Sequence, residues 1–247
     1  MNVTPPTPTR QVICGDALAW LAANPATPAA SLVASLPDVS EVGSSEERWR
    51  ELFADAVALS LNAIPPHGVA VFFQTDLKRD GRWISKAGMV LAAAERSGVP
   101  LLWHKLVCRQ APGRIQHGRP AYSHLLAFSR EARDDSRVAS ADVLPDLGEM
   151  PWTHSMGSRA AFAAVDFIRR ASPETTTILA PFCGLGTVLS AANRRGFSAI
   201  GIEQTRKRAE RAATFELADD AVPRLSRSER RDEYQRLVRA ARETSAS

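Results

Sequence analysis

A glycine turn followed by a carboxylate on the next strand is the first arrangement in this sequence that could do chemistry. Residues 176–203 predict a strand, a turn, a helix over 188–195 and a second strand that ends at Glu203. Gly184 and Gly186 lack a Cβ, so the backbone of the turn can approach a ligand closely. A helix that begins there presents backbone N–H groups to a nucleotide-like or carboxylate ligand.

The position of the acid adds to this pattern. Glu203 comes 17 residues after Gly186, where a carboxylate can accept both hydroxyls of an adenosine ribose. Thr187 is the expected N-cap of the helix, and Gly196 is the expected C′ residue that ends it. Glycines alone would leave open an ordinary βα turn without a ligand. The strand, turn, helix, strand and acid together favour a nucleoside site.

The segment PFCGLGTVLSAANRRGFSAIGIE, residues 181–203, resembles the cofactor-binding segment of S-adenosylmethionine-dependent amino-methyltransferases of the permuted β class. Those enzymes read D-P-F-x-G-x-G-T, then a helix ending in glycine, then I-G-I-E. Here Ala180 stands in place of the acid. The resemblance implies an α/β fold with a Rossmann-like, doubly wound, mostly parallel, circularly permuted seven-stranded sheet. It also implies S-adenosylmethionine as cofactor and no metal. The cofactor-binding residues that it implies are Asp16, His154, Arg159, Pro181, Phe182, Cys183, Gly184, Gly186, Thr187 and Glu203.

Three of those residues lie outside the glycine segment. Gly15 and Asp16 end an early strand, and family members often open with such a pair, whose acid lies near the adenine. A helix cap is the alternative for Asp16. Residues 152–159 resemble the family's H-x-x-x-K-P segment, so His154 and Arg159 are expected at the methionine end of the cofactor. Arg159 would contact the carboxylate there, and a purely structural histidine is the alternative for His154.

A second family motif concerns the methyl acceptor. Residues 31–36 predict a strand that runs into the sequence SLPD, where family members have D-P-P-Y or S-P-P-Y. In such a motif a polar side chain and a backbone carbonyl accept the two hydrogens of an exocyclic amine, while the aromatic ring stacks on the flipped base. Leu36 replaces the first proline and Asp38 the aromatic residue. The resemblance assigns the catalytic role to Ser35, Leu36, Pro37 and Asp38. Asp38 would accept an amine proton or grip a guanine edge, and a turn or helix cap is the alternative.

Basic and aromatic residues mark the expected nucleic-acid contacts. Residues 78–83 mix lysine and arginine with a tryptophan, and residues 109–119 form a basic hairpin. Such mixing suits phosphate contact and base stacking. A solvated hairpin, and a tryptophan that points inward, are the alternatives. The substrate-binding residues expected here and at the end of the strand 69–73 are Gln74, Lys78, Arg82, Trp83, Arg109, Arg114 and Arg119.

The composition of the chain limits its expected partners and its expected location in the cell. The chain has 247 residues, a formal charge of +4 and a sequence pI of about 9.3, which permits a nucleic-acid partner. Three dispersed cysteines and the lack of an apolar run of membrane-spanning length favour a cytoplasmic protein that binds no membrane. We expect a Pro/Thr-rich lead-in at 1–9, a methyltransferase domain at 10–222 and a charged helical tail at 223–247. A homodimer is an open alternative.

The expected reaction is direct methyl transfer to a ring or exocyclic nitrogen of a nucleic-acid base. RNA is favoured over DNA, because the acceptor motif lacks its aromatic residue and the linker 130–150 is too short for a target-recognition domain. A degenerate methyltransferase fold that serves as a nucleic-acid-binding or scaffold subunit is the alternative, based on Ala180, Leu36 and Asp38. Methylation of a protein or a small molecule is a third hypothesis.

Overall fold

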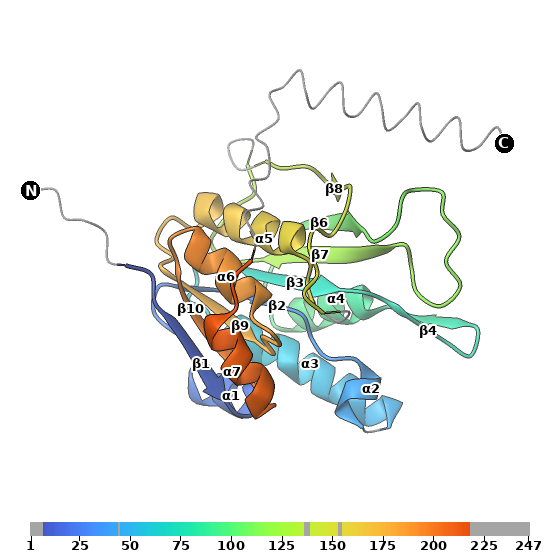
Figure 1. Ribbon diagram of the computed structural model, residues 1–247, viewed down its shortest axis with the longest axis horizontal. Coiled ribbons are helices and arrows are strands. Elements are labelled where there is room, and N and C mark those ends of the chain that lie inside the picture. Colours follow the sequence, from blue (N-terminus) through green and yellow to red (C-terminus); the bar gives the residue numbers. More distant parts are fainter. Residues whose placement is uncertain (1–6, 44, 136–138, 153–154, 218–247) are drawn as a thin grey trace, which may run out of the picture.

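The computed structural model describes residues 7–43, 45–135, 139–152 and 155–217, which build one large sheet with helices on both faces (Figure 1). Because its strands are rich in buried aliphatic residues, the sheet is covered on both sides. In spatial order the strands are β1 (Arg10–Cys14), β10 (Ser198–Glu203), β9 (Thr177–Pro181), β2 (Ala30–Ala34), β3 (Ala70–Gln74), β7 (Tyr122–Phe128), β6 (Leu101–Cys108) and β8 (Val143–Leu144).

Two hydrophobic cores lie on opposite faces of this sheet. The helices of the first face are α1 (Ala17–Ala23), α2 (Val39–Val42), α3 (Glu46–Asn62) and α4 (Lys86–Arg96). The helices of the second face are α5 (Ser158–Ala171), α6 (Thr187–Arg194) and α7 (Arg206–Thr214). A separate antiparallel hairpin, formed by β4 (Leu77–Arg79) and β5 (Arg82–Ile84), extends from the sheet on the right in Figure 1.

The strand order confirms the doubly wound, mostly parallel architecture. All neighbours from β1 to β3 pair in parallel, and only β7 runs antiparallel to its neighbours β3 and β6. The late strand β9 lies in the middle of the sheet, between β2 and β10, as the permuted order requires. The expected seven strands are joined by an eighth, the two-residue β8, because the segment before it bonds to β6. The N–H of Leu106 donates to the carbonyl of Asp142.

The junction of β9 and β2 is the topological switch point. From β9 the chain crosses through α6 to β10 on one side, whereas from β2 it crosses through α3 to β3 on the other. In open α/β sheets such a reversal leaves a crevice outside the carboxyl ends of the strands, where ligands bind. Both segments that the sequence singled out, the glycine turn after β9 and the SLPD loop after β2, begin at this crevice.

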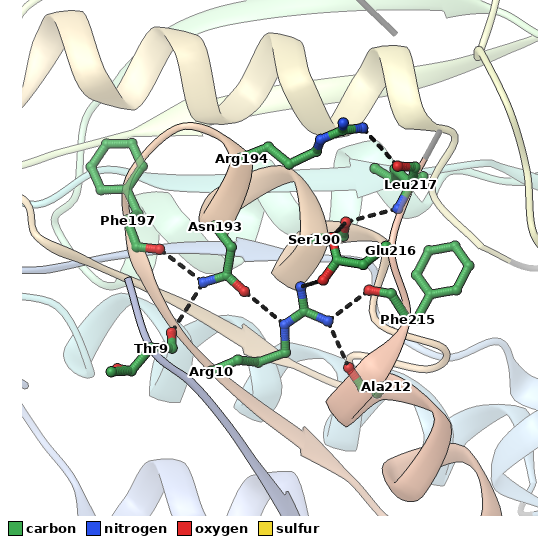
Figure 2. A network of polar contacts seen from close by, with 10 residues as sticks. All are labelled: Thr9, Arg10, Ser190, Asn193, Arg194, Phe197, Ala212, Phe215, Glu216 and Leu217. Carbon is green, nitrogen blue, oxygen red and sulfur yellow. Dashed lines mark hydrogen bonds and ion pairs between the residues drawn. The ribbon is translucent and has the colours of Figure 1, made fainter. Parts of the chain in front are cut away.

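The first and last described segments meet at α6 (Figure 2). Arg10, with a side chain only 8% exposed, donates to the Asn193 side chain at 2.7 Å and to the Phe215 carbonyl at 2.6 Å. It also pairs with Glu216, whose other oxygen accepts a hydrogen bond from Ser190. Since β1 and the segment after α7 are thereby joined, the two ends of the described domain are neighbours, as a circularly permuted fold requires.

Part of the expected lead-in packs beside the sheet. Of the expected lead-in, Thr9 bonds to Ser198 and Ala199 beside β10, whereas residues 1–6 and the tail 223–247 lie outside the described part. Within the described ranges, no helix has the length and apolarity needed to cross a membrane.

Candidate functional site

The turn between β9 and α6 has an unusual backbone. Phe182, Gly184 and Gly186 all have positive φ angles, of 60°, 57° and 92°. Glycine adopts this region without cost, but a phenylalanine there is strained, and such strain collects at ligand sites. A Cβ on Gly186 would also lie 2.9 Å from the Ala212 carbonyl oxygen. The turn is therefore tightly specified, and Gly186 is required by both its φ angle and its packing.

The helix begins one residue earlier than the sequence predicts. Gly186 is the N-cap and Thr187 is the first residue of α6, so the assignment of Thr187 as N-cap was wrong by one position. The positive φ of Gly186 places the cap on the glycine. No side chain caps this end, and Thr187 Oγ1 is buried without a hydrogen-bond partner among the described residues. The first N–H groups of α6 are thus not occupied by a capping side chain. Gly196, with a φ of 84°, follows the C-cap Arg195 as expected.

Glu203 lies at the end of β10, directly across from the turn. The residue is 7% exposed, and its carboxylate accepts hydrogen bonds from the N–H of Gly184 at 3.2 Å and of Thr205 at 2.9 Å. These two bonds fix the orientation of the carboxylate. Each oxygen keeps acceptor capacity beyond its backbone partner, which suits a ligand with two neighbouring hydroxyl groups.

A cavity of about 610 Å³ opens between these elements. Seven of the ten residues expected to bind the cofactor line it, namely Asp16, Pro181, Phe182, Cys183, Gly184, Thr187 and Glu203. The helix-cap alternative for Asp16 is confirmed, because its carboxylate caps α1 through the N–H groups of Leu18 and Ala19; the residue also lines the cavity.

Of the other three expected residues, the two that the structure describes, Gly186 and Arg159, do not line this cavity. Gly186 supports the turn from behind, against α7. Arg159 Nε pairs with Asp146 at 2.9 Å, and His154 lies outside the described residues. A cationic wall residue that the sequence did not indicate is Arg208, whose guanidinium stacks 4.3 Å from the ring of Trp152. Its position five residues after Glu203, in the first turn of α7, could have indicated from the sequence that it lies near the cavity.

The residues present fit a nucleoside-like cofactor. The volume lies within the range of small-molecule sites. A Cβ added to Gly184 would meet no atom within 4 Å, so this part of the turn faces open space. The carboxylate of Glu203 suits ribose hydroxyls, and apolar residues such as Val33 and Ile202 line the walls. Burial and the nearby Glu203 raise the pKa of the Cys183 thiol to about 12, so this side chain is neutral. Within the described ranges, no group of three or more histidine, cysteine, aspartate or glutamate side chains is arranged so that it could hold a metal ion.

The SLPD loop shares this cavity. Ser35, Leu36 and Pro37 line it together with the glycine turn. Asp38 is 8% exposed and pairs with the buried ammonium of Lys86, at 2.5 Å. Lys86 Nζ also donates to the carbonyl oxygen of Leu36 at 3.1 Å. The carbonyl that the amine hypothesis needs as an acceptor thus already has a donor in this structure.

Lys86 was missed by the sequence reasoning. It is the first residue of α4 and is 3% exposed. A local signal existed, because Lys86 precedes the buried Val90 by one helical turn and so lies on the apolar face of the helix. Its partners, 48 and 50 residues earlier in the chain, could not be identified from local pattern.

A polar cluster extends from the SLPD loop along the carboxyl edge of the sheet. Gln74 is 1% exposed, and neither polar atom of its side chain has a hydrogen-bond partner among the described residues. It pairs in register with His124, whose Nδ1 lies 2.8 Å from His104 Nε2 and whose Nε2 lies 3.3 Å from Asp76. Burial would raise the pKa of Asp76, but His124 and the N–H of Ala87 hold it below its usual value.

The remaining expected substrate contacts lie on two projections beside the loop. Trp83 is 55% exposed, with Lys78 Nζ 5.8 Å from its ring centroid, so the tryptophan does not point inward. The segment between β6 and β7 projects to the same side as the β4–β5 hairpin in Figure 1. Its root reaches the SLPD loop, because Arg119 lies 3.5 Å from Asp38. Arg82 and Arg114 are exposed farther out.

Known structures share this fold at low sequence identity. The cytosine-N4-specific PvuII DNA methyltransferase is 17% identical, with 96% of each chain covered and a TM-score of 0.66. TTHA0409 from Thermus thermophilus, named as a candidate DNA modification methylase and solved with S-adenosyl-L-methionine, is 20% identical. There the match covers 86% of this chain and 99% of the other, with a TM-score of 0.64. The chain has the fold of these methyltransferases.

A further structure, the complex of M1.HpyAVI with S-adenosylmethionine, is 15% identical with a TM-score of 0.54, covering 83% of this chain and 98% of the other. No protein-family model matches the sequence, and no curated protein matches it. Similarity is therefore visible in the fold and not in the overall sequence.

Proposed function

We propose that the protein is an S-adenosylmethionine-dependent methyltransferase that acts on a nitrogen of a nucleic-acid base. One observation supports this most strongly. The glycine turn, the N-terminus of α6 and Glu203 line the same cavity as Ser35 and Leu36 of the SLPD loop. A cofactor site and an acceptor motif in one cavity are what direct transfer between two bound molecules requires.

The cofactor would lie along the turn. Glu203, held by two backbone N–H groups, would accept the ribose hydroxyls. Asp16 lines the same cavity and would lie near the adenine, as family members suggest. Of the wall residues, Arg208 offers a positive charge. When bound, S-adenosylmethionine supplies an electrophilic methyl group on a sulfonium.

The protein itself would act mainly by positioning the two reactants. The acceptor nitrogen must face the methyl group in line, and the Ser35 side chain, which lines the cavity, would accept one of its hydrogens. The Leu36 carbonyl can accept a second hydrogen on its other lone pair or after Lys86 moves away. Correct alignment of two bound reactants can contribute about 7–11 kcal/mol to the barrier reduction.

Two observations bear on whether the nucleic acid is RNA or DNA. The sequence favours RNA because residues 130–150 are too short for a target-recognition domain. The similar structures include enzymes named for DNA, and this likeness now gives DNA at least equal weight. The proposed substrate is therefore a base in DNA or RNA, and both polymers are tested.

A second candidate function is supported by Lys86. This ammonium bonds the Leu36 carbonyl and the Asp38 carboxylate, so both of these groups in the SLPD loop already have a partner. A nucleic-acid-binding subunit without catalysis could keep such a loop. That candidate predicts binding of nucleic acid with no methyl transfer under any condition.

The direct test is incubation with S-adenosylmethionine that carries a tritiated methyl group. Single-stranded DNA, duplex DNA and total RNA are each offered, then digested to nucleosides and separated by mass. We expect one labelled N-methylated nucleoside from one polymer, and about 10–100-fold less of it with Glu203→Gln when the cofactor is limiting. Stable binding of nucleic acid with no labelled nucleoside from any polymer would favour the second candidate.

A further inference from the structure

Two arginines stand at the root of the loop between β6 and β7. The N–H groups of Arg109 and Gln110 both donate to the carbonyl of Ala121, at 2.7 and 3.1 Å, and so close the loop at its base. Arg109 directly follows β6 and Arg119 comes shortly before β7. The backbone of Arg109 is therefore anchored to the sheet, and Arg119 lies two residues before its anchor Ala121, whereas Arg114 lies near the exposed tip.

The Arg119 side chain contacts the SLPD loop, and that of Arg109 lies within electrostatic range of it. Arg119 Nη2 lies 3.5 Å from Asp38 Oδ2, with its side chain 40% exposed. Arg109 is half-buried, and its guanidinium makes no hydrogen bond or ion pair with another side chain in the described ranges. Burial lowers the pKa of Arg109, the charge of Arg119 lowers it further, and Asp38 acts in the opposite direction. Both guanidiniums thus lie within electrostatic range of each other and of the same carboxylate.

This arrangement has an excess of positive charge. Asp38 is already shared between Arg119 and the buried Lys86. Holding Arg109 beside Arg119 costs free energy by like-charge repulsion and by desolvation. An anion between the two guanidiniums would relieve both costs, and arginine binds phosphate oxygens with paired N–H donors.

We propose that Arg109 and Arg119 form a phosphate subsite at the edge of the SLPD loop. The ligand is a backbone phosphodiester of the nucleic acid. Because Asp38 belongs to the SLPD loop and also contacts Arg119, a phosphate bound here belongs to the target nucleotide or to its immediate neighbour. Phosphate contacts of this kind set the register and orientation of the strand. This inference rests on the proposed function and identifies how the acceptor is positioned.

The subsite is tested by fluorescence anisotropy with labelled single-stranded oligonucleotides of about 12 nucleotides, as DNA and as RNA. The proteins are wild type, Arg109→Gln, Arg119→Gln and, as matched control, Arg96→Gln. Arg96 is exposed in the last turn of α4. We expect each subsite variant to weaken binding about tenfold and to lower the slope of log K against log salt by about 0.7. The control should stay within about twofold.

A second variant makes the test sharper. Asp38→Asn removes the carboxylate that competes with the phosphate, so it should tighten oligonucleotide binding and steepen the salt dependence. Folding of every variant is checked by circular dichroism. The subsite is refuted if Arg109→Gln and Arg119→Gln bind like wild type, or if the control loses as much affinity. Subsite-dependent binding without methyl transfer would instead refute the proposed function and leave the subsite standing.

Discussion

Lys86 Nζ lies 3.1 Å from the carbonyl oxygen of Leu36 and 2.5 Å from Oδ1 of Asp38. One buried ammonium at the start of α4 thereby holds two of the four residues of the SLPD loop. Trp49 binds a third, because its indole N–H donates to the Pro37 carbonyl at 3.1 Å. The loop is thus held by side chains of α3 and α4, and its conformation depends on residues outside the motif.

Replacement of Lys86 should destabilise the protein. In Lys86→Met the carboxylate of Asp38 stays buried but loses its nearest cation, and the ion pair with Arg119 is longer, at 3.5 Å. Loss of one partner of a buried pair costs about 3–5 kcal/mol, and we expect the lower end of this range for the free energy of unfolding. Urea denaturation measures it.

The control for this prediction is Lys207→Met, on the exposed face of α7, which should change stability by less than about 0.5 kcal/mol. Equal stability of Lys86→Met and wild type would show that the buried ion pair does not hold the loop.

Arg10 should be the main link between the two ends of the described domain. Arg10→Met leaves the carbonyls of Ala212 and Phe215 and the side chain of Asn193 without their donor. We expect a loss of about 2–4 kcal/mol in the free energy of unfolding. The measurement is urea denaturation followed by far-UV circular dichroism.

Arg211→Met serves as the comparison for Arg10, because this side chain is exposed on α7. If both variants unfold at the same urea concentration as wild type, the network in Figure 2 contributes nothing to stability.

Cys183 should be unreactive despite its place at the cavity. Its pKa is raised to about 12, first by burial and then by the charge of Glu203. At pH 8 the thiolate, which is the reactive form, is therefore only about one part in ten thousand. Iodoacetamide at this pH should modify the exposed Cys14 and spare Cys183, as peptide mass mapping would show.

The rate at which Cys183 is modified should increase with pH. Modification of Cys183 should rise about tenfold per pH unit toward pH 12, as long as the fold persists, and in urea all three cysteines should react. Labelling of Cys183 at the rate of Cys14 at pH 8 would contradict the raised pKa.

The part of the cavity formed by the glycine turn and Glu203 was predictable from sequence because its information is local. Gly184, Gly186 and Glu203 lie within one strand–turn–helix–strand unit, and their roles depend on backbone conformation and spacing. The helix start was misplaced by one residue because a glycine with positive φ serves as N-cap, although serine and threonine are more usual.

The surroundings of the SLPD loop were only partly predictable because its contacts are distant in sequence. SLPD was identified as the motif, but Lys86 and Arg119 reach Asp38 from 48 and 81 residues away. Arg159 was expected at the cofactor on family order alone, whereas in the structure Asp146 pairs with it. Such pairings depend on tertiary packing, which the pattern of apolar residues in the sequence does not reveal.

The most direct test of the account is calorimetric titration of the protein with S-adenosylmethionine. We predict one site for wild type and about 10–100-fold weaker binding for Glu203→Gln, because a neutral amide loses the charge-assisted hydrogen bonds to the ribose. Glu95→Gln, exposed near the end of α4, should bind within about twofold of wild type. Absence of binding to wild type, or equal affinity of Glu203→Gln, would contradict the assignment of this cavity to the cofactor.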